Sequence, residues 1–166
     1  LSFLCVIVVD LVYLFFASYP AIVDVDAVAE LEQAMGYSPY STWTPYWHTR
    51  TLEAILDPAY ALLGDANAAL ACVTVAQVIF FAMCFAYVLM TFYQMGLPKW
   101  LLGAGFFIYV LYPYNIVFNV TLGKDMAFGV AMLLMLTALL RILTNTGRKY
   151  WLNYLMLLVG SFGFCM

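Results

Sequence analysis

Long apolar stretches alternate with short polar connections along this chain. The apolar stretches cover residues 1–19, 66–93, 100–113 and 126–143, and another begins at Tyr150. A membrane-spanning helix needs about 20 predominantly apolar residues, so this pattern predicts four complete spans and the start of a fifth. Pro113 removes a backbone hydrogen-bond donor, and we expect the third span to kink or end near it.

The composition also indicates a membrane protein. Of the 166 residues, 67% are hydrophobic and only 9% are charged, and the mean hydropathy of +0.98 lies outside the usual range of soluble domains. We therefore predict an all-α, multi-pass transmembrane protein in which residues 1–166 form a single membrane domain. The chain begins at Leu1 and ends inside an apolar stretch, so we expect it to be part of a longer polypeptide.

The charged residues fall unevenly on the two sides of the predicted spans. Short cytoplasmic loops of membrane proteins are enriched in lysine and arginine. The second and fourth connections carry four of the six cations and no acid, whereas eight of the nine acids lie at the first and third connections. This bias places the long loop of residues 20–65 outside a cell membrane. The cytoplasmic connections carry Lys99, Arg141, Arg148 and Lys149, and the two cations left on the outer side are Arg50 and Lys124.

Residues 22–35 of the outer loop predict an amphipathic helix that Gly36 would end. Apolar residues recur at steps of three to four positions, and polar residues occupy the opposite face. The first face carries Ile22, Val25, Val28 and Met35 together with Glu32, and the second carries Asp26, Glu30 and Gln33. A helix of this kind lies in the membrane interface rather than crossing the bilayer.

The rest of the outer loop is also expected to fold. Residues 37–49 contain five aromatic residues, two prolines and the only histidine, in no helical pattern. Residues 57–64 predict a short helix with Asp57 as its N-cap, Pro58 at its first position and Gly64 at its end. The loop is therefore predicted to be a folded segment that lies against the membrane.

Several polar residues of this loop have structural as well as functional explanations. Asp24 could cap the interfacial helix, because aspartate is a favoured N-cap residue. Asp26 and Glu30 could form a solvated helix face. His48 could be a packed, hydrogen-bonded histidine, and Arg50 could pair with the glutamate three residues later.

Lys124 is harder to explain by structure alone. It begins the fourth predicted span, where the helix dipole disfavours a cation by roughly 0.3–1 kcal/mol. A phosphate bound at that helix end would relieve the conflict, because Lys124 would then supply the opposite charge. Alternatively, Lys124 could extend to water beside Asp125. A lipid-linked phosphate could leave its tail between helices and present its headgroup to a loop carboxylate, whose action as a general base is worth about 10²–10⁴ in rate.

Three stretches carry a resemblance to a known family. They are YPAIVDVDAVAELEQAMG at 19–36, PYWHT at 45–49 and YPYNIVFNVTLGKDMAF at 112–128, in this order. They contain, in sequence, a first span that ends in Tyr-Pro, a following Asp, an amphipathic helix that ends at a Gly, a Pro-x-x-His-Thr segment and a Lys-Asp pair that opens a later span. Together these features resemble those of the integral-membrane glycosyltransferases of the GT-C superfamily.

The resemblance implies roles for specific residues. Members of the superfamily typically use a polyprenyl-phosphate sugar and carry an acidic motif in the first outer loop. Asp26 and Asp24 match that motif, which implies a catalytic base or, in metal-dependent members, ligands for Mg²⁺ or Mn²⁺. Lys124 and Asp125 match the Lys-Asp pair, which implies a phosphate contact for the lysine. Arg50 and His48 would assist in substrate binding.

We therefore expect a glycosyltransferase that moves a sugar from a polyprenyl-phosphate donor to a glycan, lipid or protein acceptor at the outer membrane face, by Asp-assisted inverting transfer. The alternative is a transporter or a non-enzymatic membrane subunit in which Asp10, in the middle of the first span, marks an ion path. Asp10 could equally be a neutral residue facing other helices. The chain has no basic patch for nucleic acid and no glycine-rich nucleotide motif.

Overall fold

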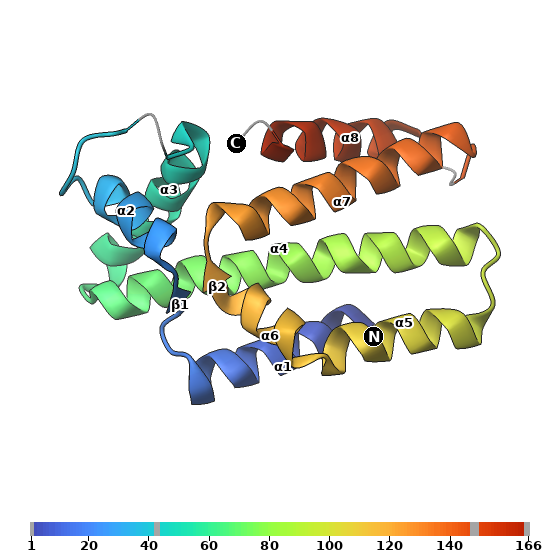
Figure 1. The fold of residues 1–166 in the computed structure, drawn as a ribbon, viewed down its shortest axis with the longest axis horizontal. Coiled ribbons are helices and arrows are strands. Elements are labelled where there is room, and N and C mark those ends of the chain that lie inside the picture. The colour runs from blue at the N-terminus through green and yellow to red at the C-terminus, as the bar shows by residue number, and fades with distance from the viewer. Residues whose placement is uncertain (1, 42–43, 147–149, 165–166) are drawn as a thin grey trace.

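A computed structural model describes residues 2–41, 44–146 and 150–164, and these residues form eight helices and two very short strands (Figure 1). The helices are α1 (Ser2–Ala17), α2 (Val25–Ala34), α3 (Tyr46–Leu63), α4 (Ala66–Gln94), α5 (Lys99–Leu111), α6 (Pro113–Val120), α7 (Lys124–Leu143) and α8 (Tyr150–Phe164), and the strands are β1 (Ile22–Val23) and β2 (Thr121–Leu122). The prediction of an all-α protein is confirmed.

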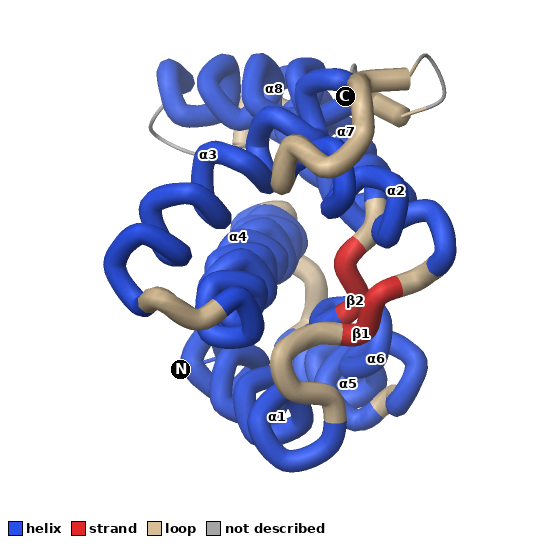
Figure 2. The backbone as a smooth tube through the Cα atoms, turned by 90° about the vertical axis from the view of Figure 1, so that its left-hand side faces the viewer, coloured by secondary structure: helices blue, strands red, loops and turns tan. Residues whose placement is uncertain are grey.

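The long helix α4 forms the axis of the molecule. Helices α1, α5 and α6 lie on one side of it, and α7 and α8 lie on the other, while α2 and α3 gather near its N-terminal end (Figures 1 and 2). Buried Leu14, Val78 and Val120 join α1, α4 and α6 in one apolar cluster. This arrangement places the ends of α1 and α6, and the start of α7, beside the helices of the outer loop.

The helix boundaries follow the predicted spans closely, but fewer helices than expected are long enough to cross a bilayer. Among the described residues, α4 and α7 are long and apolar enough, and α5 with α6 makes a third candidate if this pair, bent by 61°, acts as one span. The bend lies at Pro113, as predicted. Helix α1 has 16 residues and is shorter than a typical span. The chain is therefore an integral membrane protein with two to three candidate spans.

A helix forms within residues 22–35, but it begins only at Val25 because Ile22 and Val23 form β1, and the assignment of its faces was wrong. Glu30 is fully buried, whereas Val25 is 87% exposed. The buried face is instead built on Ala27, Leu31 and Ala34, which join a core with residues of α3 and α4. Small alanine side chains allow these helices to approach closely, and Glu30 is carried into the protein because it lies on the same face.

The short helix predicted at residues 57–64 is part of a longer one. Helix α3 begins at Tyr46 and runs through Pro58 to Leu63, so Asp57 does not cap a helix. Gly64 does end it, with a φ of 67° that suits a residue without a Cβ. The residues of 46–49 that were expected to be irregular form the first turn of α3, which positions His48 on its buried face.

The charge pattern predicts Arg141 at a connection between spans, but the structure places it within a helix. It occupies the last turn of α7 and is 6% exposed. Its guanidinium donates to Asn153 Oδ1 of α8 at 2.8 Å and to Thr91 Oγ1 of α4 at 3.0 Å, and it lies over the Tyr87 ring. Arg141 therefore ties three helices together. Arg148 and Lys149, the other cations predicted for this connection, lie outside the described residues.

Candidate functional site

A two-residue parallel pairing brings the two candidate segments together. Ile22 pairs with Thr121 and Val23 with Leu122, so the chain segments that follow β1 and β2 leave side by side (Figure 2). Gln77 of α4 supports the pairing by donating to the carbonyl oxygens of Asn119 and Thr121 at 3.0 and 2.8 Å. The acids that follow β1 therefore face the start of α7.

Asp24 fits against Gly123 at this junction. Its Oδ1 accepts a hydrogen bond from Ala27 N at 2.7 Å, so the alternative assignment of Asp24 as the N-cap of α2 is confirmed. Its Oδ2 lies only 2.9 Å from the position that a Cβ on residue 123 would take. A glycine is therefore needed at position 123 for the Asp24 carboxylate to sit where it does.

Asp26 and Lys124 meet directly. Their Oδ2 and Nζ atoms are 3.0 Å apart, and the side chains remain 62% and 31% exposed. Asp125 makes no hydrogen bond or ion pair of its own within the described part of the chain, but it lies in electrostatic range of Lys124, as does Glu30. The site thus places three carboxylates, those of Asp26, Glu30 and Asp125, in range of one ammonium group, while Asp24 lies against the neighbouring Gly123.

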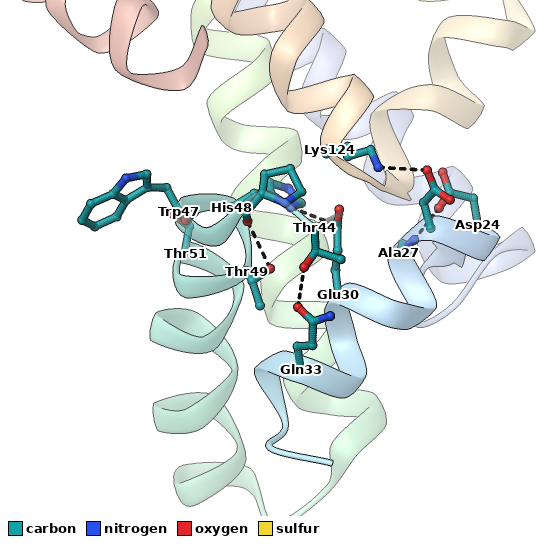
Figure 3. A network of polar contacts seen from close by, with 12 residues as sticks. Asp24, Ala27, Glu30, Gln33, Thr44, Trp47, His48, Thr49, Thr51 and Lys124 are labelled. Carbon is teal, nitrogen blue, oxygen red and sulfur yellow. Dashed lines mark hydrogen bonds and ion pairs between the residues drawn. The ribbon is translucent and has the colours of Figure 1, made fainter. Parts of the chain in front are cut away.

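Glu30 and His48 form a second, buried pair beside the first (Figure 3). His48 Nδ1 and Glu30 Oε2 are 2.9 Å apart, and the two side chains are 7% and 0% exposed. Neither carboxylate oxygen of Glu30 nor Nδ1 has a well-aligned hydrogen bond among the described residues. The contact between them is therefore the main polar interaction that each of these groups makes. Glu30 is not the solvated residue that the helix pattern allowed.

Neighbouring polar residues hold α2 against the start of α3. Thr44 Oγ1 donates to Gln33 Oε1 at 2.6 Å, just before α3 begins. Thr49 is completely buried and its Oγ1 donates to the carbonyl oxygen of Pro45 at 3.2 Å. These contacts fix the helix turn that carries His48, and so they fix the histidine relative to Glu30.

Arg50 belongs to a different, exposed cluster. It donates to Glu53 Oε2 at 2.6 Å and to Tyr46 Oη at 3.1 Å, and it lies over the rings of Tyr40 and Tyr46. The predicted alternative, a pairing with Glu53, is confirmed. The Tyr40 hydroxyl and the Arg50 guanidinium both donate to Glu53, and this lowers the pKa of the Glu53 carboxyl. The hydrogen bonds of the guanidinium to Tyr46 and to Glu53 raise the pKa of Arg50, so its charge is committed to these partners.

Two grooves lie on either side of α7. The first, which we call the apolar groove, has a volume of about 280 Å³ and is lined by residues that include His48, Gln77, Phe80, Ala127, Ala131 and Phe162. The second, which we call the polar groove, also has a volume of about 280 Å³ and is lined by residues that include Tyr109, Asn115, Asn119 and Asp125. Each groove therefore reaches a polar residue in the first turn of a helix: His48 of α3 lines the apolar groove, and Asp125 of α7 lines the polar groove.

Asp10 lies deeper, behind the polar groove. It is 2% exposed, and its Oδ2 accepts from Asn119 Nδ2 at 2.8 Å. The Tyr109 hydroxyl donates to Asn119 Oδ1 at 3.3 Å. The buried Asp10 carboxyl group is therefore linked through Asn119 to Tyr109, and both of these neutral residues line the polar groove.

Asp24 and Asp26, the possible metal ligands, are each engaged by a partner within the protein. Magnesium takes about six oxygen ligands in near-octahedral geometry. Within residues 2–41, 44–146 and 150–164, no group of three or more His, Cys, Asp or Glu side chains could hold a metal ion. Asp24 caps a helix and Asp26 pairs with Lys124. We therefore derive no step through a metal at Asp24 and Asp26.

Sequence reasoning missed the buried half of this site. Glu30 was assigned to the solvated face because the sequence contains no sign of what α2 packs against. A usable signal was present: Ala27, Leu31 and Ala34 recur at steps of three to four positions and define a small-residue face that includes Glu30. Asn119, which binds Asp10, and Gln77, which binds the backbone at β2, belong to no sequence pattern that would have pointed to these contacts.

Comparison with known proteins identifies the family but no activity. The model of DUF6020, a family of unknown function, matches residues 48–156, so the chain belongs to this family. The matched segment begins at His48 and includes Lys124, whereas Asp24, Asp26 and Glu30 precede it. No curated protein and no solved structure matches the chain.

Proposed function

We propose that this DUF6020 protein is an integral-membrane glycosyltransferase that moves a sugar from a polyprenyl-phosphate donor to an acceptor hydroxyl at the outer membrane face. The single observation that carries the proposal is the 3.0 Å contact between Asp26 and Lys124. The two residues are almost 100 positions apart in the sequence. The resemblance to the GT-C superfamily implies that Asp26 acts on the acceptor and that Lys124 contacts the donor phosphate.

The pair suggests how donor binding and base function are coupled. While Lys124 is paired with Asp26, its ammonium group occupies the carboxylate oxygen Oδ2 that would have to meet an acceptor hydroxyl. A phosphate that takes over the ammonium group would leave Asp26 free to accept the proton of an acceptor hydroxyl. The acceptor oxygen then bonds to the anomeric carbon, the bond from that carbon to the phosphate oxygen breaks, and the electron pair of that bond stays on the phosphate.

The surroundings of Lys124 suit an amphiphilic donor. Ala127 and Ala131 follow Lys124 at three and seven positions along α7, which puts all three on one helix face. Both alanines line the apolar groove. A lipid could therefore place its first isoprene units along this groove while its phosphate reaches the ammonium group at the start of the helix.

The test is a transfer assay with membranes that contain the protein and a panel of radiolabelled polyprenyl-phosphate sugars. We expect label to move into an acceptor fraction, and we expect Asp26→Asn to lower the rate by about 10²–10⁴-fold while still binding polyprenyl phosphate. Glu32→Gln is the matched control, because it removes an exposed acid from the same helix. Absence of transfer by the unaltered protein, or full activity of Asp26→Asn, would contradict the proposal.

A transporter is the second candidate, and the position of Asp10 favours it. A buried carboxyl group within the membrane helices is costly and usually functional, and its partners Asn119 and Tyr109 face the polar groove whose outer end carries Asp125. In this case Asp10→Asn would abolish ion or proton flux into proteoliposomes. The glycosyltransferase proposal instead predicts that Asp10→Asn retains transfer activity.

A further inference from the structure

We infer that Glu30 is a positioning residue for His48, and that the pair presents an N–H donor to the phosphate of a lipid substrate in the apolar groove. The inference rests on the proposed function for the identity of the lipid phosphate. It assigns a role to a glutamate that the resemblance does not include, and it explains why a fully buried carboxylate accompanies the only histidine of the chain.

The burial of Glu30 constrains the charge of the pair. The side chain of Glu30 has no exposed surface, and His48 Nδ1 lies 2.9 Å from its carboxylate. An isolated buried charge is strongly unfavourable unless it is paired. The low-energy arrangements are therefore those in which the pair is neutral as a whole and shares one proton between the carboxylate and Nδ1.

Both neutral arrangements place a hydrogen on the other ring nitrogen. If Glu30 is ionised, His48 is an imidazolium and both of its nitrogens are donors. If Glu30 holds the proton and donates it to Nδ1, the neutral imidazole carries its hydrogen on Nε2. Because Nδ1 is committed to Glu30 and His48 lines the apolar groove, Nε2–H is the ring donor that remains for a ligand.

The charges around Lys124 show why a second donor matters. Three carboxylates lie in electrostatic range of one ammonium group at this site, and that ammonium group is already engaged by Asp26. Arg50 cannot supply the missing positive group, because its guanidinium is bound to Glu53 and Tyr46 in a separate cluster. An anionic headgroup therefore needs a hydrogen-bond donor besides Lys124, and His48 is the residue placed to provide it.

The groove selects a lipid phosphate over a free one. Apart from His48, Gln77 and Thr51, its lining side chains are apolar, and it runs between α3, α4, α7 and α8. A prenyl chain would cover this apolar surface, whereas inorganic phosphate would leave it in contact with water. His48 lines this groove, and Lys124 lies about one helix turn before the lining residue Ala127, so phosphate and tail would be recognised by one continuous surface.

The test uses ¹⁵N-histidine-labelled protein in detergent and farnesyl phosphate as the probe. We expect the Nε2 signal of His48 to shift when farnesyl phosphate binds, with little change for farnesol or inorganic phosphate. The His48→Gln variant assigns the signal. Glu30→Gln removes the negative charge that stabilises an imidazolium at His48, so we expect a smaller shift and binding weakened by about 10- to 100-fold, the range of one hydrogen bond to a charged group. Glu32→Gln should bind like the unaltered protein.

Four outcomes overturn the inference. The first is an Nε2 signal of the unaltered protein that does not respond to farnesyl phosphate, a measurement that needs no variant to fold. The second is an equal response to inorganic phosphate, which would remove the lipid requirement. The third is normal affinity in Glu30→Gln, and the fourth is an equal loss in Glu32→Gln, which would indicate a general charge effect. Glu30→Asp, which retains the carboxylate, should restore part of the shift.

Failure of this inference and failure of the proposed function can be told apart. If the protein transfers sugar but His48 ignores the lipid phosphate, the role of Glu30 and His48 is wrong and the glycosyltransferase proposal stands. If His48 responds to farnesyl phosphate but no sugar is transferred, the lipid-phosphate site stands and the proposed reaction is wrong.

Discussion

The substitution Gly123→Ala tests the junction on which the candidate site depends. The φ of Gly123 is 170°, an extended conformation that any residue adopts, so the backbone itself would not resist the change. The added methyl group would instead lie 2.9 Å from Asp24 Oδ2 and 3.6 Å from its Cγ. Asp24 would have to move, and its hydrogen bond to Ala27 N at 2.7 Å would break.

The expected cost follows from the lost cap. Removal of an aspartate N-cap costs about 0.5–2 kcal/mol, typically about 1 kcal/mol. For a chain of 166 residues this corresponds to a fall in melting temperature of roughly 2–4 °C per kcal/mol. Because Asp26 lies in the first turn of α2, the same movement should also separate it from Lys124 and lower sugar transfer, if the proposed function is right.

The assay is thermal unfolding of the detergent-solubilised protein, together with hydrogen exchange of the first-turn amides of α2. Gly129→Ala is the matched control: it also lies in α7, and an added Cβ there would meet nothing within 4 Å. We expect it to be neutral or stabilising, by up to about 1 kcal/mol, because alanine is the better helix former.

A double substitution completes the test. In an Asp24→Ala background the carboxylate that Gly123→Ala would displace is absent, so the second substitution should cost little further stability. The reasoning is refuted if Gly123→Ala lowers the melting temperature no more than Gly129→Ala does. It is also refuted if Gly123→Ala causes the same loss of stability in the Asp24→Ala background, because contact with the Asp24 carboxylate would then not be the cause.

Three other predictions concern stability away from the site. Gly160→Ala would place a Cβ 2.7 Å from the backbone nitrogen of Met135, so α8 must move from α7, with a loss of about 1–3 kcal/mol that thermal unfolding would detect. Arg141→Met should cost about 1–3 kcal/mol in the same assay, because it removes the guanidinium donor from the buried threonine of α4 and from the buried asparagine of α8, which keeps only the longer hydrogen bond from Tyr87. Glu53 has a folded-state pKa below its ordinary value of 4.5, so its contribution is present above that pH and is lost as the pH falls below it. A pH titration of the melting temperature should show this loss, and Glu53→Gln should remove it.

Each of these predictions has a result that would contradict it. Gly103→Ala, where a Cβ would meet nothing within 4 Å, should be harmless, and equal effects at positions 103 and 160 would count against close helix contact. An unchanged melting temperature in Arg141→Met would mean that an apolar side chain replaces the buried network without cost. A pH response that persists in Glu53→Gln would belong to other carboxyl groups.

The membrane helices could be predicted from the sequence because their signal is local. A run of apolar residues as long as α4 needs no information about its neighbours to be recognised, and Pro113 and Gly64 end or bend helices through their own covalent structure. The same holds for the Asp24 cap and for the pairing of Arg50 with Glu53, which join residues three positions apart. The side of the membrane on which the outer loop lies remains a prediction.

The errors lie where packing between distant segments decides. Glu30 and Arg141 have the sequence context of solvated charges, yet both are buried because neighbouring helices cover them. Asp57 has the context of an N-cap, but α3 continues through Pro58 because its preceding turns are already held by the core around Leu52 and Leu56. Contacts of this kind override local preference, since burial of a helix face outweighs a single cap.

The sequence by itself determined that the chain is an apolar, helical membrane protein with acids in one loop and a Lys-Asp pair at the start of a later helix. Only the tertiary structure decided that these groups meet, through a parallel pairing of two residues from each segment, and that a buried glutamate and histidine lie beside them. The physical reason is that hydrophobic periodicity is written into neighbouring residues, whereas the approach of Asp26 to Lys124 depends on the packing of every helix between them.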